Sequence, residues 1–249
     1  MVMIPKDHPR YESLKVREAL VDGYEKGVTV LEGLIAHGRG EAFDYLIGEE
    51  TIAQAEKAIE ASTALLLTAE DPVISVNGNT AALCPEELID LASIINAKLE
   101  VNLFHRSVER EKLIEEVLKE HGAEKVYGID PTKEIEGLSS ERRKVDEGGI
   151  YTSDVVLVAL EDGDRTEALI KNGKRVIAID LNPLSRTARC ASITIVDNVI
   201  RAVPRLIEVA ERLNSSRKEE LLKIVENFDN RENLKSCLRF INKRLEKLE

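Results

Sequence analysis

Between residues 72 and 196, short apolar runs alternate with longer segments of amphipathic, helical pattern. Parallel strands need a crossover of a dozen or more residues, usually a helix, to connect them. The alternation therefore predicts a doubly wound α/β fold, with a Rossmann-like, mostly parallel sheet and helices on both faces. The predicted strands are residues 73–76, 100–104, 125–128, 154–160, 175–179 and 192–196. The predicted helices between them are residues 85–97, 108–121, 140–147 and 165–172.

Residues that commonly start and stop helices stand at the expected boundaries of these elements. Pro85 suits a first helical position, where its missing N–H is not needed, and Ser107 suits an N-cap. Gly122 and Gly173 stand where helices should end before the next strand. These local signals agree with the predicted strand order.

The N-terminal part reads as mostly helical. Helical periodicity covers residues 11–26 and again 51–70. Between them, Gly38 and Gly40 interrupt the pattern, which predicts a sharp turn just before a short apolar-acidic helix. The tail, residues 198–249, reads as two or three helices. We expect a single domain over residues 1–249, made of a helical segment (1–70), an α/β core (71–197) and C-terminal helices (198–249).

Composition limits the cellular location and the binding partners that we expect for this chain. The chain is 43% hydrophobic and 33% charged, has no apolar stretch long enough to span a bilayer, and lacks a signal peptide over Met1–Arg10, so we expect a cytoplasmic protein without a membrane partner. A net charge of −11 disfavours nucleic acid as a partner. Abundant Lys, Arg and Glu, with no Trp, indicate a thermophilic source. Cys84, Cys190 and Cys237 form no CxxC pair, so free thiols are expected and no metal ligand is assigned.

Several enzyme signatures are missing. The sequence contains no GxxxxGK[ST], HExxH, GxSxG or protein-kinase motif set. Gly38 and Gly40 form a GxG pattern, but Phe43 occupies the place of the third glycine and no clear strand precedes it, so NAD binding has weak support. Standard phosphate-loop and hydrolase machinery is thereby disfavoured.

The densest polar motif is IDLNPLSRTARC, residues 179–190, which continues directly from a predicted strand. A carboxylate at such a strand end, Asp180, can accept hydrogen bonds from a ribose diol, and Asn182 can contact a base edge or sugar. Arg186 brings a guanidinium suited to phosphate, and Thr187 adds a hydroxyl. Asp197 or Asn198 follows the next strand at a helix start, where an anion is favoured. The alternative is that the acidic residues only cap helices and Arg186 is a surface charge.

Two further polar clusters follow strands or glycines. Asn77, Asn79, His105 and Arg106 follow two predicted strands, where loops carry binding groups. His37 and Arg39 lie in the segment HGRG at 37–40. Together these residues offer a cationic pocket. Taken singly, a histidine such as His105 is more often structural, and SVNGN at 75–79 is also compatible with a simple turn.

The chain resembles the archaeal phosphopantothenate synthetases, also called 4-phosphopantoate:β-alanine ligases. The resemblance rests on long motifs in order: HPRYESL (8–14), GLIAHGRGEAFDYLIGE (33–49), PVISVNGNTAAL (72–83), EVNLFHR (100–106), LEDGDR (160–165) and DLNPLSRTA (180–188). It implies synthesis of phosphopantothenate for coenzyme A from 4-phosphopantoate, β-alanine and ATP with Mg²⁺, through an acyl-adenylate, and it implies a homodimer. The ATP site implied by the resemblance comprises Arg17, Arg39, Asp180, Leu181, Asn182, Arg186, Thr187, Asn198 and Val199.

The sequence indicates the substrate-binding residues less specifically than the ATP-binding residues. We expect Asn77, Asn79 and His37 to bind substrate, and His105 and Arg106, in the same phosphopantoate pocket, to act in catalysis. Three other classes remain open from sequence. They are a nucleotide-dependent regulatory binding module without catalysis, an NAD-linked oxidoreductase, and a purely structural protein.

Overall fold

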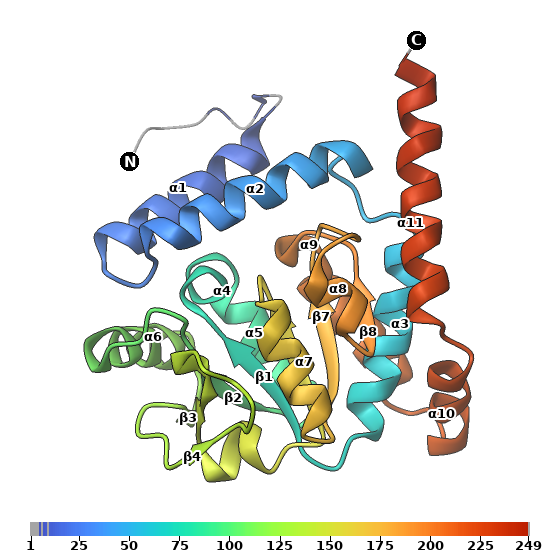
Figure 1. The fold of residues 1–249 in the computed structure, drawn as a ribbon. Coiled ribbons are helices and arrows are strands. Elements are labelled where there is room, and N and C mark those ends of the chain that lie inside the picture. The colour runs from blue at the N-terminus through green and yellow to red at the C-terminus, as the bar shows by residue number, and fades with distance from the viewer. Residues whose placement is uncertain (1–4, 6, 9, 249) are drawn as a thin grey trace.

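The computed structural model describes residues 5, 7, 8 and 10–248 (Figure 1). Its centre is a six-stranded sheet in the order β3-β2-β1-β6-β7-β8, and every neighbouring pair is parallel, which confirms the predicted Rossmann-like α/β class. The strands are β1 (Pro72–Val76), β2 (Lys98–Val101), β3 (Val126–Tyr127), β6 (Val155–Ala159), β7 (Arg175–Ile179) and β8 (Ile193–Ile195). The order reverses between β1 and β6, and in open sheets ligands bind beyond the carboxyl ends of the strands at such a point.

The central strands are apolar along their whole length because both faces of the sheet are covered. All residues of β1 (PVISV) and β6 (VVLVA) are buried, and Ile74 pairs in register with Leu157. Parallel strands buried on both faces read as continuous apolar runs rather than as alternating ones. This is why the strands were visible in the sequence.

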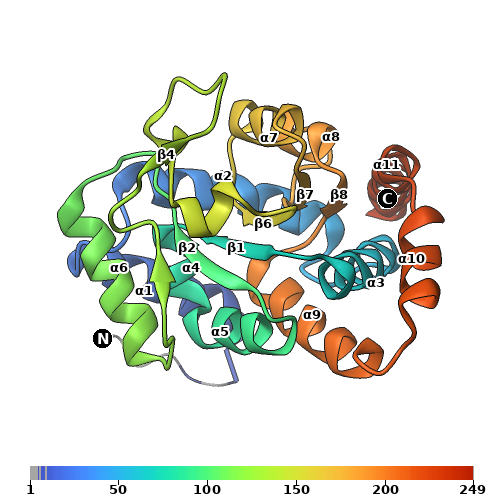
Figure 2. The ribbon, with the colours of Figure 1, turned by 90° about the horizontal axis from the view of Figure 1, so that it is seen from below.

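Helices cover both faces of the sheet, as predicted (Figure 2). One face carries α3 (Ala53–Thr68), α5 (Pro85–Ile94), α6 (Val108–Glu120) and α9 (Val199–Leu213), while α7 (Gly163–Lys171) and α8 (Arg186–Cys190) lie on the other. Pro85 occupies the first turn of α5, and Ser107 caps α6 by accepting a hydrogen bond from the Arg110 amide at 3.2 Å. Gly122 and Gly173 follow α6 and α7 with positive φ. The predicted cap signals are thus confirmed.

Helices α1 (Tyr11–Glu25) and α2 (Leu31–Ile47) form a layer across the carboxyl ends of the strands, next to the short helix α4 (Gly78–Leu83) (Figure 1). The predicted turn at Gly38 and Gly40 is wrong, because α2 runs through both glycines and ends at Ile47, followed by the C-cap Gly48, whose φ is 96°. A helical glycine costs only about 1 kcal/mol relative to alanine. Packing of the apolar side of α2 around Ile47, which is fully buried, outweighs that cost.

The predicted helix at residues 140–147 is also wrong. That segment forms a 3₁₀ turn (Glu141–Arg143), the short strand β5 (Lys144–Val145) and the start of a π-helical turn (Glu147–Tyr151). β5 pairs with β4 (Lys133–Glu134) in an antiparallel ribbon. The reason is tertiary, because buried Glu100 accepts hydrogen bonds from the amides of Asp146 and Ile150, which fixes the chain in a non-helical path.

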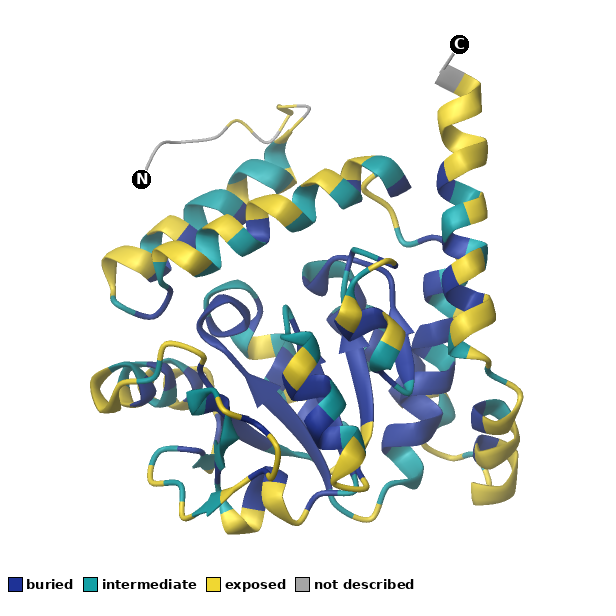
Figure 3. Ribbon diagram, in the orientation of Figure 1, coloured by how far each residue is buried: buried dark blue, intermediate teal, exposed yellow. Residues whose placement is uncertain are grey.

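Three helices follow the sheet, within the predicted range of two or three. They are α9, α10 (Lys218–Glu226) and α11 (Asn230–Leu245), and the latter two pack on α3. Figure 3 shows that buried positions concentrate in the sheet and on the inward sides of these helices. The three cysteines are free, as predicted. None of the helices described has the length and apolar character needed to cross a membrane.

Candidate active site

Two adjoining cavities lie between the carboxyl ends of the strands and α2. The first, of about 430 Å³, is enclosed by α2, the loop after β6, the loop after β7 and the start of α9. The second, of about 330 Å³, is enclosed by α2 and the segments that follow β1 and β2. Three residues line both cavities, namely Ala36, Leu160 and Asp162. The two cavities therefore meet at one shared wall.

The structure brings most of the predicted nucleotide residues together around the first cavity. It is lined by Arg39, Asp180, Leu181, Asn182, Arg186, Thr187, Asn198 and Val199, and also by His37. These residues come from three separate segments, namely α2, the β7–α8 loop with the first turn of α8, and the start of α9. The topology of a parallel sheet places the loops at the same edge, which is why residues far apart in sequence meet here.

Asp180 is partly buried at the start of the β7–α8 loop. Its carboxylate accepts hydrogen bonds from the Asn182 amide at 2.9 Å and from the Ser185 hydroxyl. Burial raises the pKa of Asp180, and the two hydrogen bonds act in the opposite direction. Ser185, not Asp180, caps α8 by accepting a hydrogen bond from the Ala188 amide at 2.8 Å. The alternative that Asp180 is merely a helix cap therefore does not apply, although Asp180 does shape its loop.

The other polar groups of the first cavity are tied to the scaffold in different ways. Thr187 donates a hydrogen bond from its hydroxyl to the Glu161 carbonyl at 2.8 Å. Arg186 is exposed and pairs with Glu167, a contact that leaves it on the rim. Asn198 caps α9, a helix of 15 residues, and its side-chain amide donates to Asp44 at 2.9 Å. The free amides at the start of a helix this long favour an anion in the adjacent cavity.

Arg39 and His37 project from α2 and have no protein partner that satisfies them. Arg39 is exposed, and among the described residues no carboxylate lies within ion-pair distance of it. His37 is only 6% exposed, and its Nε2 atom has no hydrogen-bond partner. Burial lowers the pKa of His37, so the imidazole is neutral near pH 7. Arg39 thus supplies positive charge to a cavity that Asp180 also lines, and this charge acts against the rise in the pKa of the Asp180 carboxyl.

Asn77, Asn79 and His105 line the second cavity. Asn77 caps α4, and its side-chain amide donates to the Ala159 carbonyl at 2.7 Å. Asn79 donates to the Gly33 carbonyl at 2.8 Å, which ties the loop after β1 to α2. His105 is half exposed and stacks edge-on against Phe104. All three residues therefore border the cavity, and the two asparagines also hold its walls together.

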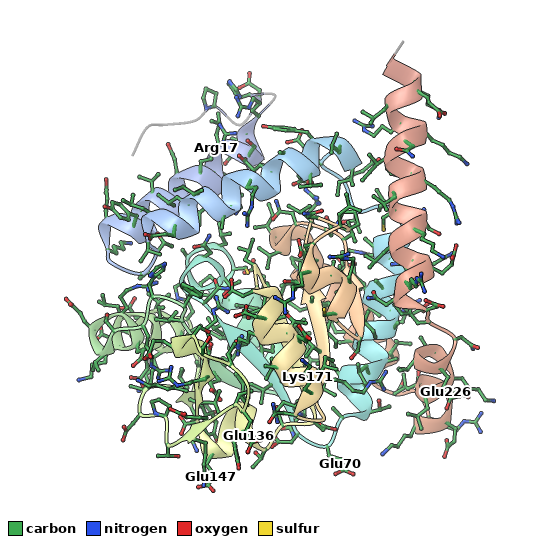
Figure 4. The ribbon with its side chains drawn as sticks, viewed as in Figure 1. Arg17, Glu70, Glu136, Glu147, Lys171 and Glu226 are labelled. Carbon is green, nitrogen blue, oxygen red and sulfur yellow. The ribbon has the colours of Figure 1, made fainter. Side chains whose placement is uncertain are left out.

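Two of the predicted site residues lie outside both cavities. The guanidinium of Arg106 pairs with Glu111 and donates to the carbonyls of Lys144 and Gly128 at 3.1 and 2.9 Å. Its hydrogen-bonding groups are occupied by the protein, so the geometry gives Arg106 a scaffold contact rather than a substrate contact. Arg17, labelled on α1 in Figure 4, donates to Glu41 at 3.1 and 3.3 Å, and these hydrogen bonds raise its pKa. Its role in ATP binding stays a prediction.

A buried charged network behind the shared wall was missed at the sequence level. Glu161 pairs with Arg142 at 2.5 Å and with Arg165, and both Glu161 and Arg165 are almost completely buried. Burial alone would raise the pKa of Glu161, but the two guanidinium groups outweigh it and hold the pKa below its ordinary value. Arg165 also donates to the Ser75 hydroxyl at 3.2 Å. The available signal was the acidic-basic motif LEDGDR directly after a strand.

A Rossmann-like sheet with cavities beyond the carboxyl ends of its strands is an arrangement typical of nucleotide-binding enzymes. The family model described as phosphopantothenate/pantothenate synthetase matches residues 54–244 of this chain. The chain belongs to this family, which confirms the resemblance seen in its motifs.

Similar curated proteins agree with that assignment. A 4-phosphopantoate–β-alanine ligase of Thermococcus kodakarensis is 59% identical over 100% of this chain and 95% of the relative. The ligases of the same name from Methanosarcina mazei and Methanospirillum hungatei are 53% and 46% identical, each over 98% of this chain and over 96% and 98% of the relatives. The predicted enzyme class, a ligase, is thereby confirmed, and a ligase of this type implies the use of a nucleotide.

Proposed function

We propose that this chain joins 4-phosphopantoate to β-alanine at the expense of ATP, with phosphopantoyl adenylate as the intermediate and AMP and pyrophosphate as products. The observation that carries the proposal is the pair of cavities that meet at Asp162, in a chain of this family. One cavity is suited to a nucleotide and the other to a small anion. Their shared wall is where the α-phosphorus of ATP and the substrate carboxylate would come together.

ATP fits the first cavity by chemistry. Asp180 carries a carboxylate at a strand end, where it can accept hydrogen bonds from a ribose diol. Leu181 and Val199 offer apolar surface to the base. Arg39 and the free amides at the start of α9 offer positive charge to the phosphates. Two anions must be aligned against their mutual repulsion for adenylation, and fixed positive groups lower that barrier.

The phosphopantoate position in the second cavity is supported by its cationic and polar lining. Arg110 is partly buried there and lends its positive charge to the cavity, while its two Nη atoms donate to the carbonyls of His105 and Val28. Asn77, Asn79 and His105 surround the same space. A phosphate and a carboxylate both need donors of this kind. In this arrangement His105 contacts substrate, whereas Arg106 supports the loop from behind.

Mg²⁺ is proposed to accompany the triphosphate of ATP. Among the described residues, no group of three or more His, Cys, Asp or Glu side chains is arranged to hold a metal ion. Mg²⁺ in nucleotide sites usually keeps several waters and takes its remaining ligands mainly from the phosphates. The donor set here does not form a metal site of its own, so no step is assigned to the metal.

The decisive experiment is to incubate the protein with ATP, Mg²⁺, 4-phosphopantoate and β-alanine and to separate the nucleotides by chromatography. AMP and pyrophosphate in equal amounts with phosphopantothenate are expected. ADP in stoichiometric amounts would contradict adenylation. Tight ATP binding with no turnover would instead favour a regulatory nucleotide-binding module.

The family resemblance also leads us to propose a homodimer that works on small molecules. From composition and net charge we propose that it works in the cytoplasm and has no nucleic-acid partner. Light scattering coupled to size-exclusion chromatography measures the mass in solution. A mass near that of one 27.8 kDa chain at working concentration would contradict the dimer.

A further inference from the structure

The amine substrate needs a binding group of opposite charge to those that bind the other two substrates. ATP and phosphopantoate are anions, but β-alanine carries an ammonium group that must be bound and then deprotonated before it can attack. Five carboxylates border the two cavities: Glu32, Glu161, Asp162, Asp180 and Asp197. A group that serves the ammonium must lie near both the nucleotide and the acyl group, and it must have a free oxygen.

Four of the five carboxylates do not meet these conditions. Glu161 is enclosed by two arginines and is 2% exposed. Asp180 holds its own loop through Asn182 and Ser185, and Asp197 accepts hydrogen bonds from Thr51, Arg201 and the Asn198 amide. Glu32 lies on the outer rim of the second cavity, with 64% of its side chain exposed.

Asp162 meets both conditions. Of the three residues that line both cavities, Asp162 alone has a titratable side chain. It stands at the N-cap position of α7, where an aspartate normally accepts a hydrogen bond from the first turn, yet its side chain makes no such bond. Among the described residues its single charged partner is Arg142, whose Nε lies 3.1 Å from Oδ2. The side chain is 39% exposed, so the carboxylate is anchored on one side and open on the other.

The surroundings of Asp162 also suit a group that takes up a proton. Burial raises its pKa, the guanidinium of Arg142 acts in the opposite direction, and the neighbouring Glu161 and Asp164 add to the rise. A base is most effective when its pKa approaches the working pH, so a raised carboxyl pKa favours this use. Arg142 divides its charge between Asp162 and Glu161, with which it also forms an ion pair.

We propose that the Asp162 carboxylate binds the ammonium group of the amino-acid substrate at the junction of the two cavities and accepts its proton. The inference rests on the proposed function, because it places the amine beside the acyl-adenylate. One proton passes from nitrogen to Asp162, and the nitrogen lone pair forms the C–N bond at the acyl carbon. The C–O bond to AMP then breaks, with its electron pair leaving on the phosphate oxygen. The second nitrogen proton goes to water, and Asp162 returns its proton to solvent.

The test separates the two half-reactions in Asp162→Asn and in the matched control Asp90→Asn, an exposed aspartate on α5 that borders neither cavity. Phosphopantoate-dependent exchange of labelled pyrophosphate into ATP measures adenylation without β-alanine. Formation of phosphopantothenate measures the amide step. For Asp162→Asn we expect a rate of pyrophosphate exchange within threefold of wild type and a fall of at least one hundredfold in kcat/KM for β-alanine. Hydroxylamine should restore product release, because this nucleophile is largely unprotonated at neutral pH.

Three results would overturn the proposal. The first is an equal loss of exchange and amide formation, which would give Asp162 a structural or metal-holding role. The second is an unchanged kcat/KM for β-alanine. The third is an absence of pyrophosphate exchange in the wild-type protein itself. Unlike the first two results, it would contradict the proposed function as well as the role of Asp162.

A second variant guards against misfolding. Asp162→Glu keeps the charge that faces Arg142 and moves the carboxylate by one methylene. We expect a wild-type melting temperature, normal exchange and an amide step slowed at least fivefold. If Asp162→Glu and Asp162→Asn both formed the amide at the wild-type rate, the position of this carboxylate would not matter.

Discussion

Glu161 and Arg165 form an ion pair in which the two side chains are 2% and 0% exposed. The pair lies one turn apart, with Glu161 in the β6–α7 loop and Arg165 on α7. Glu161 also pairs with Arg142, and its carbonyl accepts a hydrogen bond from Thr187 at the first cavity. The wall shared by the two cavities is therefore fixed from behind by buried charge.

The first prediction concerns this pair. Removing one partner of a buried ion pair leaves the other charge uncompensated and typically costs about 3–5 kcal/mol. Glu161→Ala should thus lower the melting temperature by roughly 6–20 °C for a chain of this size. Thermal unfolding followed by circular dichroism measures the change. Glu136→Ala, at an exposed position, is the control and should melt within about 2 °C of wild type, since exposed substitutions have small effects. Equal melting of the two variants would contradict the assigned role of Glu161.

The second prediction uses Glu100, which is fully buried beneath the π-helical turn. Burial raises its pKa from 4.5 to about 7, although hydrogen bonds from the Ile150 and Asp146 amides act against the rise. The folded protein therefore holds a proton that the unfolded chain has lost between these two pH values. Stability should fall as pH rises through this window, and the contribution of Glu100 is at most roughly 3 kcal/mol.

Denaturant unfolding at several pH values between 4.5 and 8 measures this effect. Glu100→Ala will be less stable overall, because two amides lose their acceptor, but it should lack the part of the pH slope that Glu100 contributes. The informative quantity is the difference in free energy of unfolding between variant and wild type, plotted against pH. A difference that does not vary with pH would rule out a raised pKa at Glu100.

The third prediction concerns Asp180. Asp180→Asn should weaken ATP binding at least tenfold, about 1.4 kcal/mol, while phosphopantoate binding changes much less, because the carboxylate faces the first cavity only. The amide can still accept one of the two hydrogen bonds that shape the loop. Isothermal titration with each substrate separately measures the two affinities. An equal loss for both, with a lowered melting temperature, would show that the loop had rearranged instead.

The sequence predicted the part of the candidate site that lies within one continuous segment. The residues from Asp180 to Thr187 occupy one strand-turn-helix segment, so their common location followed from the predicted end of β7. The prediction was wrong where tertiary contacts determine the local conformation. Gly38 and Gly40 favoured a turn locally, but packing of α2 keeps them helical.

Residues that meet only in three dimensions were the hardest to predict. Arg106 follows a strand, as a site residue would, yet the carbonyls of Gly128 and Lys144 and the carboxylate of Glu111 occupy its guanidinium. Arg142 comes from a segment that was predicted to be an ordinary helix, and it reaches Asp162 in the loop after β6. Neither relationship has a periodic signature, because each depends on how distant loops are brought together.

The last prediction concerns Arg39, the cation on α2 that borders the first cavity. Gly40 lies next to it and lines the same cavity, so no side chain from that position occupies the space beside Arg39. Arg39→Ala should raise the Kd for ATP at least tenfold and lower turnover to a similar extent, because a phosphate loses its charge-assisted partner. Arg39→Lys keeps the charge but loses the planar fork, so it should recover only part of the affinity.

Arg231→Ala is the matched control for Arg39, because Arg231 is exposed on α11 and borders neither cavity. Its ATP affinity should equal that of wild type. If Arg39 were only a solvated helix residue, Arg39→Ala, Arg39→Lys and Arg231→Ala would all bind ATP equally well and melt at the same temperature. A graded series, with Ala weaker than Lys and Lys weaker than Arg, requires a guanidinium at this position in contact with the nucleotide, since neither helix stability nor net charge produces that order.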